Sequence, residues 1–251
     1  MRSFILALQF LTVFPVQRDT EIRTEELAGS MSWFPLVGAL QGLILVLSYY
    51  MLSGLLSDNV VTGLLVLILV LTNGGLHLDG FADTVDGLAG GSTPEDRLRI
   101  MRDSATGAIG VVFLVMILLL KFLALGDLPD EVKVPTLFLF PIVGRWAMVP
   151  MACWSDYARS TGGLGAAFAR NKTSTLIKAT IITSVLCALS LGLLSLFLLL
   201  LIGGVVFFFS RFFRKKIGGV TGDVFGFQSE IAEVLFIIMV LALTNLSEMD
   251  F

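Results

Sequence analysis

The sequence predicts an all-α, polytopic integral membrane protein, and three observations lead to this fold class. Hydrophobic residues make up 56% of the 251 residues, charged residues make up 15%, and the mean hydropathy is +0.91. A soluble domain of this length could not bury so much apolar surface. The apolar residues form runs of about 20, which is the length of a membrane-spanning helix. Lysines and arginines gather between alternate runs, as they do in the cytoplasmic loops of membrane proteins.

About seven apolar windows are long enough for transmembrane helices. The fifth window is short, so the fifth and the sixth could instead form one long broken segment. The expected spans are residues 33–56, 60–78, 108–125, 135–153, 176–191, 193–212 and 231–246.

An apolar run at residues 4–14 precedes the first span. It resembles the core of a signal peptide, but Gln9 interrupts it, Pro15 ends it and no small-residue cleavage pattern follows. We therefore expect an interfacial or re-entrant helix. Cys153 and Cys187 lie in apolar spans without metal-ligand spacing, which indicates packing roles. No linker or internal repeat divides the chain, so residues 1–251 are expected to form a single membrane-embedded domain.

The basic residues predict the orientation, because short cytoplasmic loops carry an excess of positive charge. The loops after the first, third and fifth spans contain only Lys133 as a basic residue. Seven spans then give a cytoplasmic N-terminus, an external C-terminus and charged loops that face the cytosol. The net charge of −3 argues against a general nucleic-acid-binding surface. The basic residues of the charged loops are Arg2, Arg18, Arg23, Arg97, Arg99, Arg102, Arg159, Arg170, Lys172, Arg211, Arg214, Lys215 and Lys216.

The most informative polar motif directly follows the second apolar run. It reads Gly-Gly-Leu-His-Leu-Asp-Gly-Phe-Ala-Asp-Thr-Val-Asp-Gly over residues 74–87. Asp79, Asp83 and Asp86 are spaced i, i+4 and i+7, so on a helix they fall within roughly 60° of one another. Like charges repel in that arrangement, whereas a hard divalent cation needs convergent carboxylate oxygens. The motif therefore predicts a metal-bound phosphate site at the membrane surface.

The loop after this motif predicts two short helices joined by a glycine turn. Ser92 or Thr93 would cap the second helix, which has Pro94 at its first position and would end at Gly107. It would return Arg102 and Asp103 toward the carboxylates, where a guanidinium fork suits phosphate oxygens. The arginines at positions 97 and 99 are better explained as solvated members of a positive loop.

A second acidic constellation lies near the end of the chain, at residues 218–226 and the helix that follows. Asp223 and Glu230 are seven residues apart and share a helix face, with Glu233 on its flank. Two acidic clusters on one membrane face suggest a shared site. The alternative is that the two glutamates simply favour a helix N-terminus through its dipole.

Arg145 falls inside the fourth span, where a charge costs about 2.5–3.5 kcal/mol unless it faces a polar interior. We expect an anionic partner, either a carboxylate such as Asp83 or Asp223 or a substrate phosphate. Lys121 lies near a span end, from which its ammonium group could snorkel to the membrane surface. The single histidine, His77, could be a general base or a metal ligand. On a continuous helix it would point away from the aspartates, so a structural role is the alternative.

Together these residues resemble the cobalamin (5′-phosphate) synthase family, the adenosylcobinamide-GDP ribazoletransferases. The resemblance extends over most of the chain, and its two acidic blocks are long and specific. The matching blocks are Phe14-Pro15-Val16, Phe34-Pro35-Leu36-Val37-Gly38, the acidic motif of residues 74–87, Met101-Arg102-Asp103-Ser104, Gly144-Arg145, Tyr157-Ala158-Arg159, and Gly-Gly-x-Thr-Gly-Asp at 218–223 with Glu230 and Glu233.

The resemblance implies a catalytic domain that performs an Mg²⁺-dependent transfer, the final step of nucleotide loop assembly in cobalamin biosynthesis. A ribose hydroxyl of α-ribazole, or of its 5′-phosphate, displaces GMP from adenosylcobinamide-GDP. Such phosphoryl transfer depends mainly on positioning and on cations that neutralise the diphosphate. The expected roles are metal binding by Asp79, Asp83, Asp86 and Asp223, phosphate binding by Arg102 and Arg145, and proton acceptance by Asp103, Glu230 or His77.

The expected partners are the two substrates and the lipid bilayer of the inner (plasma) membrane. A homo-oligomer and an association with other enzymes of the pathway are further possibilities. Gly38 and Gly42 permit a close helix contact without indicating which helix makes it.

Two other functions compete with this expectation. A CDP-alcohol phosphotransferase of lipid synthesis also uses membrane-interface aspartates and Mg²⁺, but its motif includes an alanine-arginine pair that is missing here. A membrane cation transporter would place its acids near the bilayer midplane. Here the acids are expected at cytoplasmic helix ends, beside arginines that would repel a cation.

Overall fold

The protein is all-α, as a computed structural model of the chain shows for residues 2–14, 23–159, 164–169 and 171–249. Pro15, Val16, Arg18 and Arg170 lie outside these described residues. The helices are α1 (Arg2–Leu11), α2 (Thr24–Ser30), α3 (Phe34–Leu52), α4 (Asp58–Asn73), α5 (Leu76–Gly90), α6 (Pro94–Ile100), α7 (Ala108–Gly126), α8 (Asp130–Trp154), α9 (Thr173–Leu191), α10 (Leu194–Ile217) and α11 (Gly222–Met249), with short 3₁₀ turns η1 (Met31–Trp33) and η2 (Leu164–Ala167).

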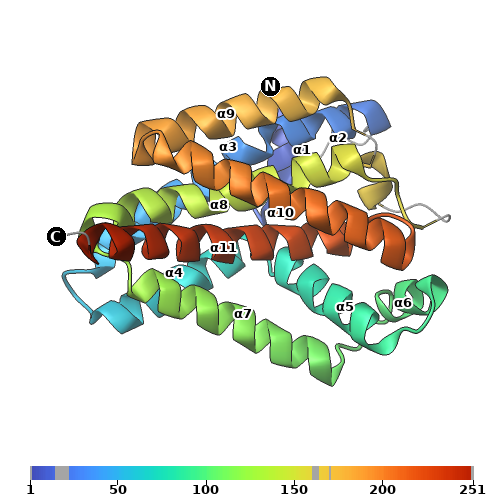
Figure 1. The fold of residues 1–251 in the computed structure, drawn as a ribbon, viewed down its shortest axis with the longest axis horizontal. Helices are drawn as coiled ribbons and strands as arrows, with labels where there is room; N and C mark the ends of the chain where they lie inside the picture. The colour runs from blue at the N-terminus through green and yellow to red at the C-terminus, as the bar shows by residue number, and fades with distance from the viewer. Residues whose placement is uncertain (1, 15–22, 160–163, 170, 250–251) are drawn as a thin grey trace.

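The long helices run side by side along the longest axis of the molecule (Figure 1). Within the described ranges, six helical segments are long and apolar enough to cross a membrane, and α4 with α5 makes a seventh if that bent pair is one span. The chain is therefore a multi-pass membrane protein. The fifth and sixth expected spans form two separate helices, α9 and α10, because Gly192 at φ +72° turns the chain between them.

The expected second span, residues 60–78, is wrong at its C-terminal end. Helix α4 ends at Asn73, and α5 leaves it at an angle of 89°. Gly74 and Gly75 both have positive φ, 64° and 73°, a backbone conformation that residues with a Cβ atom rarely adopt. The Asn73 side chain accepts a hydrogen bond of 3.0 Å from the Gly75 amide and so stabilises the turn. The acidic motif consequently begins a new helix instead of ending the span.

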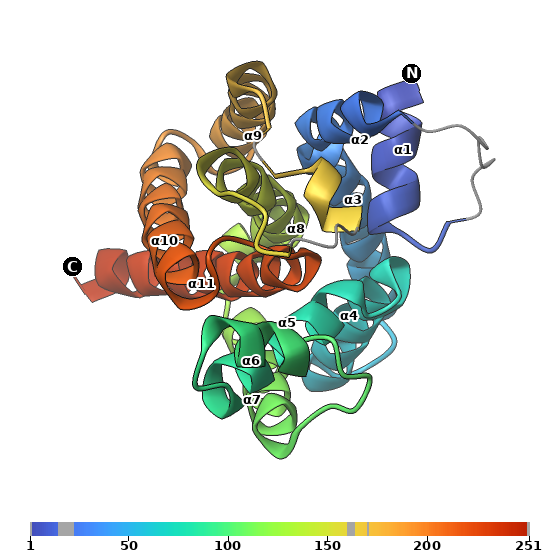
Figure 2. The same cartoon turned by 90° about the vertical axis from the view of Figure 1, so that its right-hand side faces the viewer.

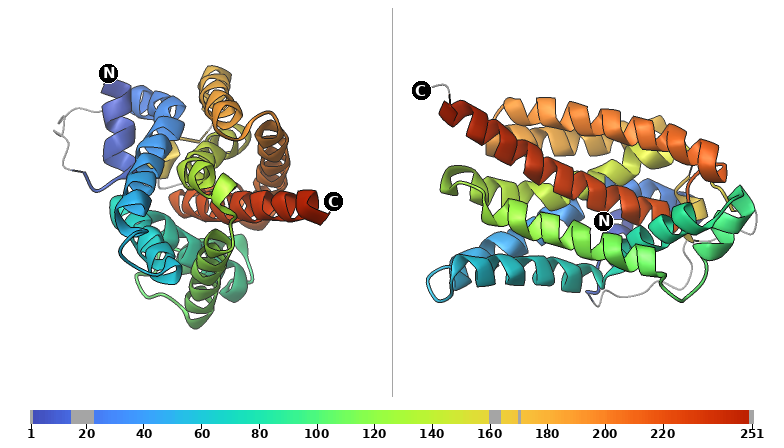
Figure 3. Two further views of the ribbon diagram at one scale, coloured as in Figure 1. Left: turned by 90° about the vertical axis from the view of Figure 1, so that its left-hand side faces the viewer. Right: turned by 60° about the horizontal axis from the view of Figure 1, so that its bottom comes forward.

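Helices α8 and α11 form the centre of the bundle. In the apolar segments of α8 and α11, 89% and 72% of the residues are buried, against 22–33% in the corresponding segments of α7, α9 and α10. The end-on views place α8 among the surrounding helices (Figures 2 and 3). Helix α3 packs closely on α8, since a Cβ atom at Gly38 would lie 2.6 Å from the Pro141 carbonyl oxygen and one at Gly42 would collide with Phe138. The close contact expected of these two glycines is thus made within the chain.

The polar loops meet at one end of the bundle, the right-hand end in Figure 1. The loops after α8 and α10 are joined there by a β-bridge between Tyr157 and Val220. Helix α6 begins as expected, with the Thr93 hydroxyl accepting from the Asp96 amide at 3.1 Å. The Arg97 side chain donates to the Lys216 carbonyl oxygen at 3.0 Å and fastens α6 to the end of α10. These contacts fix the surroundings of α5.

Candidate functional site

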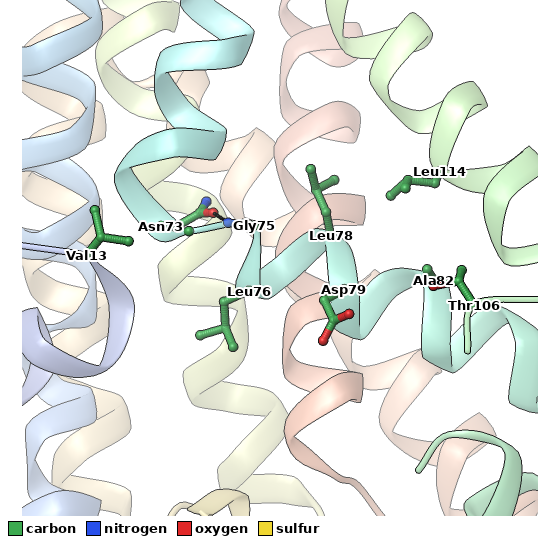
Figure 4. A pocket seen from close by; sticks show the side chains of 10 residues that line it. Val13, Asn73, Gly75, Leu76, Leu78, Asp79, Ala82, Thr106 and Leu114 are labelled. Atoms are coloured by element: carbon green, nitrogen blue, oxygen red, sulfur yellow. Dashed lines mark hydrogen bonds between the residues drawn. The ribbon is translucent and has the colours of Figure 1, made fainter. Parts of the chain in front are cut away.

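The three aspartates of the acidic motif lie on a single helix, α5, as their spacing predicts. Asp79 is in its first turn, where the helix dipole favours a negative charge. Figure 4 shows that the Asp79 side chain projects from α5 beyond the bend, apart from the apolar side chain of Leu78. The helical spacing therefore places the carboxylates beside one another along α5.

Helix α11 brings a fourth carboxylate to this cluster. It crosses α5 so closely that a Cβ atom on Gly80 would lie 2.8 Å from the Asp223 Cα atom. A Cβ atom on Gly226 would likewise lie 2.9 Å from the carbonyl oxygen of His77. Glycine at these two crossing points is what permits the approach of α11. The structure thus packs Asp223 against the helix that carries the three aspartates, and its role in binding a metal remains a prediction.

The carboxylates repel one another and share few positive charges. Asp83 experiences repulsion from Asp79, Asp223 and Asp86, and attraction from Arg159. It is also partly desolvated, which increases the cost of leaving several negative charges uncompensated. Such a cluster becomes favourable when a cation, or a substrate that brings one, neutralises it.

Arg159 holds Asp223 in place. Its Nη2 atom donates to the Asp223 Oδ2 atom at 2.6 Å and to the Met101 carbonyl oxygen at 3.3 Å. The Thr221 hydroxyl donates to the same carboxylate oxygen at 3.1 Å. The sequence placed Arg159 only in a basic loop. The Tyr157-Ala158-Arg159 block was the signal that could have identified it as a site residue.

Asp86 accepts hydrogen bonds from backbone amides at the start of α7. Its Oδ2 atom accepts from the Gly107 amide and its Oδ1 atom accepts from the Gly110 amide, both at 2.7 Å. Asp86 thus caps the N-terminus of α7 and favours it electrostatically as well. Each carboxylate oxygen of Asp86 retains a second lone pair, but the two amide hydrogen bonds fix the direction in which that lone pair points.

The donor set suits a magnesium ion that is held partly by a substrate. Within the described ranges, no group of three or more His, Cys, Asp or Glu side chains is gathered as a complete metal site. Magnesium, however, usually takes one or two protein carboxylates, and water and substrate phosphates complete its octahedron. Asp79, Asp83 and Asp223 offer hard oxygen ligands of that kind.

Two cavities adjoin this cluster, and both are lined by Leu76 and Asp79. The larger is open and measures about 610 Å³ (Figure 4). The smaller measures about 220 Å³ and is more enclosed. The larger is lined by Val13, Asn73, Gly74, Gly75, Leu76, Leu78, Asp79, Ala82, Thr106 and Leu114.

His77 lines the smaller cavity and is buried, with 2% of its surface exposed. Neither ring nitrogen has a hydrogen-bond partner within the part of the chain that the structure describes. The structural alternative required a hydrogen-bond partner for this histidine, and the described residues do not supply one. Both ring nitrogens are themselves buried, and the residue contributes to the wall of the cavity.

Arg145, Glu230 and Glu233 belong to a separate buried network. Arg145 is fully buried and pairs with Glu233 and with the Ser229 hydroxyl. Neither Asp83 nor Asp223, the carboxylates considered from the sequence, is its partner. Glu230 lies 2.6 Å from the Lys121 Nζ atom. The structure thus does not bring Glu230 or Arg145 together with the aspartates.

The expectation that Lys121 snorkels is wrong. Its side chain is 2% exposed, and its Nζ atom lies 2.6 Å from a carboxylate oxygen of Glu230 and of Glu233. Lys121 on α7 and Arg145 on α8 therefore balance the two glutamates of α11. Partnered in this way, four charges can be accommodated inside the bundle.

Arg102 and Asp103 lie in the exposed loop after α6, because that helix ends at Ile100 and does not continue to Gly107 as expected. The Asp103 carboxylate accepts from the Ala105 amide at 3.1 Å. The contact between Arg159 and the Met101 carbonyl oxygen brings the start of this loop to the aspartate cluster.

Comparisons with known proteins agree with these features. The family model of cobalamin-5-phosphate synthase matches residues 3–241. A protein of Geotalea daltonii is 40% identical over 97% of this chain and 98% of its own length, and one of Desulforamulus reducens is 39% identical over 95% and 96%. A protein of Pseudomonas entomophila is 40% identical over 95% and 98%. All three are named adenosylcobinamide-GDP ribazoletransferase.

No solved structure matches the fold. The family match nevertheless includes both acidic motifs and Arg159, and it ends within the last spanning helix, α11. The chain therefore belongs to the cobalamin-5-phosphate synthase family.

Proposed function

We propose that this protein joins adenosylcobinamide-GDP to α-ribazole, or to α-ribazole 5′-phosphate, and releases GMP. The main observation in support is that the α5 aspartates, Asp223 and Arg159 lie together beside two cavities. The relatives of this chain are also named as this transferase. The products are adenosylcobalamin or its 5′-phosphate. This is the last step of nucleotide loop assembly in cobalamin biosynthesis.

The reaction requires Mg²⁺ in this proposal, with Asp79, Asp83 and Asp223 as the protein ligands. The ion would neutralise charge on the diphosphate and on the departing GMP. Asp86 would contribute mainly by keeping α7 beside the cluster, since both of its oxygens accept amide hydrogen bonds.

Arg159 is placed to contact phosphate oxygens next to the carboxylates, and it takes the role that the sequence gave to Arg145. A guanidinium suits such oxygens because its N–H groups form a planar fork. Arg102 can reach the same substrate from the loop after α6. Their positive charge would stabilise the transition state as negative charge shifts toward the leaving group.

The acceptor hydroxyl must lose its proton as the new ester bond forms. Of the three candidates, His77 lines the smaller cavity, and its ring nitrogens are unpartnered within the described residues. Glu230 is held by Lys121 deeper in the bundle. Asp103 lies in an exposed loop. This distribution favours His77 as the proton acceptor.

The site faces the cytoplasm of the inner membrane in this proposal, as the distribution of basic loops favours. Cysteine at position 92, beside the site, and at position 57, at the other end of the bundle, would test the orientation in a variant that lacks Cys153 and Cys187. In intact cells, a membrane-impermeant thiol reagent should label Ser57→Cys and not Ser92→Cys. The reverse pattern would contradict the orientation. Association with a second copy or with other pathway enzymes remains a prediction.

The function is tested with detergent-purified protein supplied with both substrates. GMP and the cobalamin product should appear in equal amounts with Mg²⁺ and should disappear with a chelator. Asp83→Asn should abolish both products while preserving the elution profile of the folded protein. Asp130→Asn is a matched control, because the Asp130 side chain is 89% exposed and begins α8, whose other end leads to the loop that carries Arg159. Absence of both products with the folded wild type would refute the proposal.

A further inference from the structure

The lining of the smaller of the two cavities combines apolar side chains with charged ones. Phe10, Met148 and Phe225 contribute apolar surface from α1, α8 and α11. Arg159 and Asp223 contribute charge. A ligand that fills it should therefore combine a flat apolar group with a polar group.

We propose that this cavity is the acceptor site, where the aromatic base of α-ribazole lies against Phe10, Met148 and Phe225. This assignment rests on the function proposed above. The thioether of Met148 and the two phenyl rings suit an aromatic ring system, through sulfur–aromatic and ring–ring contacts. The ribose then points toward Asp79 and Asp223.

Size distinguishes the two substrates. The cavity of about 220 Å³ is below the usual range of about 300–1,000 Å³ for sites that enclose drug-sized ligands. It can hold a fused two-ring base, but not the corrin ring of adenosylcobinamide-GDP. The corrinoid substrate must approach from the open side of the carboxylate cluster.

Two of the lining residues, His77 and Arg159, carry buried polar atoms that favour a ligand with several hydrogen-bonding groups. Within the described residues, the Arg159 Nε atom and both ring nitrogens of His77 are buried without a partner. Buried polar groups are costly unless a hydrogen bond is made to them. Ribose hydroxyl groups, and a 5′-phosphate where the acceptor carries one, supply such partners.

Binding in this cavity brings the acceptor to Asp79, which also lines the larger cavity. There a ribose hydroxyl oxygen bonds to the phosphorus atom attached to the cobinamide. The bond between that phosphorus and the bridging oxygen breaks, and GMP leaves with the bonding electrons. The hydroxyl proton passes to His77 or to water. The acceptor thus enters from one side of Asp79 and the diphosphate from the other.

Variants of Met148 test the assignment because this residue lines the cavity and carries no charge. Met148→Trp should fill the base site and raise the KM for α-ribazole about tenfold or more, with the KM for adenosylcobinamide-GDP within twofold of wild type. Leu114→Trp is the matched control, since Leu114 lines the larger cavity alone. It should leave the KM for α-ribazole unchanged.

Met148→Ala provides a second measurement if the tryptophan variant does not fold. The enlarged cavity should shift selectivity, measured as the ratio of kcat/KM values, by about tenfold toward a nucleoside whose base has a third fused ring. A general structural defect would lower both values together and leave that ratio unchanged. An unchanged ratio in folded protein would overturn the assignment.

Equilibrium dialysis with labelled α-ribazole separates this inference from the proposed function. Wild-type protein and Leu114→Trp should bind the nucleoside without the second substrate, and Met148→Trp should bind it at least tenfold more weakly. Equal binding by all three would overturn the acceptor site. Binding with this pattern but without GMP release would support the site and refute the proposed transfer.

Discussion

Arg159 and Asp223 form an ion pair of 2.6 Å that links the loop after α8 to the first turn of α11. The two residues are 64 positions apart, and they meet because a β-bridge holds their loops together. Arg159→Ala should release Asp223 and remove a phosphate contact, which lowers kcat/KM for adenosylcobinamide-GDP about 100-fold.

Arg159→Lys should recover part of that loss, because an ammonium group keeps the charge but not the fork. Arg99→Ala is the control, since the Arg99 side chain is 77% exposed and forms an ion pair with Asp96 on its own helix. Steady-state kinetics of the three variants check the prediction. Equal activity of Arg159→Ala and Arg99→Ala would show that the ion pair is dispensable.

Asp86 and Asp83 should respond differently to substitution. Asp86→Ala leaves the amides of Gly107 and Gly110 without their acceptor, and this should cost about 2 kcal/mol of stability. Asp83→Asn should leave the unfolding temperature in detergent near that of wild type and remove activity. Thermal unfolding measured beside turnover checks both. Equal unfolding temperatures for Asp86→Ala and wild type would contradict the capping role.

Lys121→Met should destabilise the bundle strongly, by about 3–5 kcal/mol, because it leaves buried carboxylates short of one positive charge. Adding Glu230→Gln should restore much of the stability, since Glu233 keeps its partner Arg145. The half-life of the detergent-solubilised protein at a raised temperature is a suitable measure. If the double variant is no more stable than the single variant, the network does not stabilise the bundle by balancing buried charges.

Gly80→Val should separate α5 from α11. The Cβ atom alone would lie 2.8 Å from the Asp223 Cα atom, and overpacking of this kind costs about 1–3 kcal/mol. Because Asp223 moves away from Asp83, the affinity for Mg²⁺ should fall together with stability. Gly203→Ala is the control, because its Cβ atom would meet Trp146 at an ordinary 3.6 Å. Mg²⁺ titrations of activity should distinguish them, and the same half-saturation point in both would refute the prediction.

Apolar length in the sequence was enough to predict a multi-pass helical protein, and the expected seven spans match the structure only if the bent pair α4 and α5 is counted as one span. The bend at Gly74-Gly75 was missed, because the apolar run continues through it to Leu78 and hydropathy contains no information on backbone dihedrals. The Thr93 cap of α6 was predictable because capping is a local interaction. Local patterns thus predicted where helices begin better than where they end, because both the positive-φ turn after α4 and the end of α6 at Ile100 were missed.

The site was predictable in part. The i, i+4, i+7 spacing placed the α5 aspartates on one face, and the Asp223 block suggested a shared site. The sequence could not assign partners across helices: Lys121 to Glu230 and Arg145 to Glu233 are separated by 109 and 88 residues. Contacts between residues so far apart depend on how α7, α8 and α11 are rotated about their axes, which spacing within one helix does not specify.

The right-angled bend before α5 also has an electrostatic consequence. A helix that continued straight from Asn73 would carry Asp83 about 15 Å further along the axis of α4, into bulk water. The 89° bend instead keeps the carboxylates level with the end of α4. Where that end meets the surface of a bilayer, the carboxylates lie directly above a slab of low dielectric constant. Water then screens their charges from one side only, so their field on an approaching cation or diphosphate is stronger. A bilayer can thus assist a reaction between water-soluble molecules, because its low-dielectric interior reduces the screening of the charges at its surface.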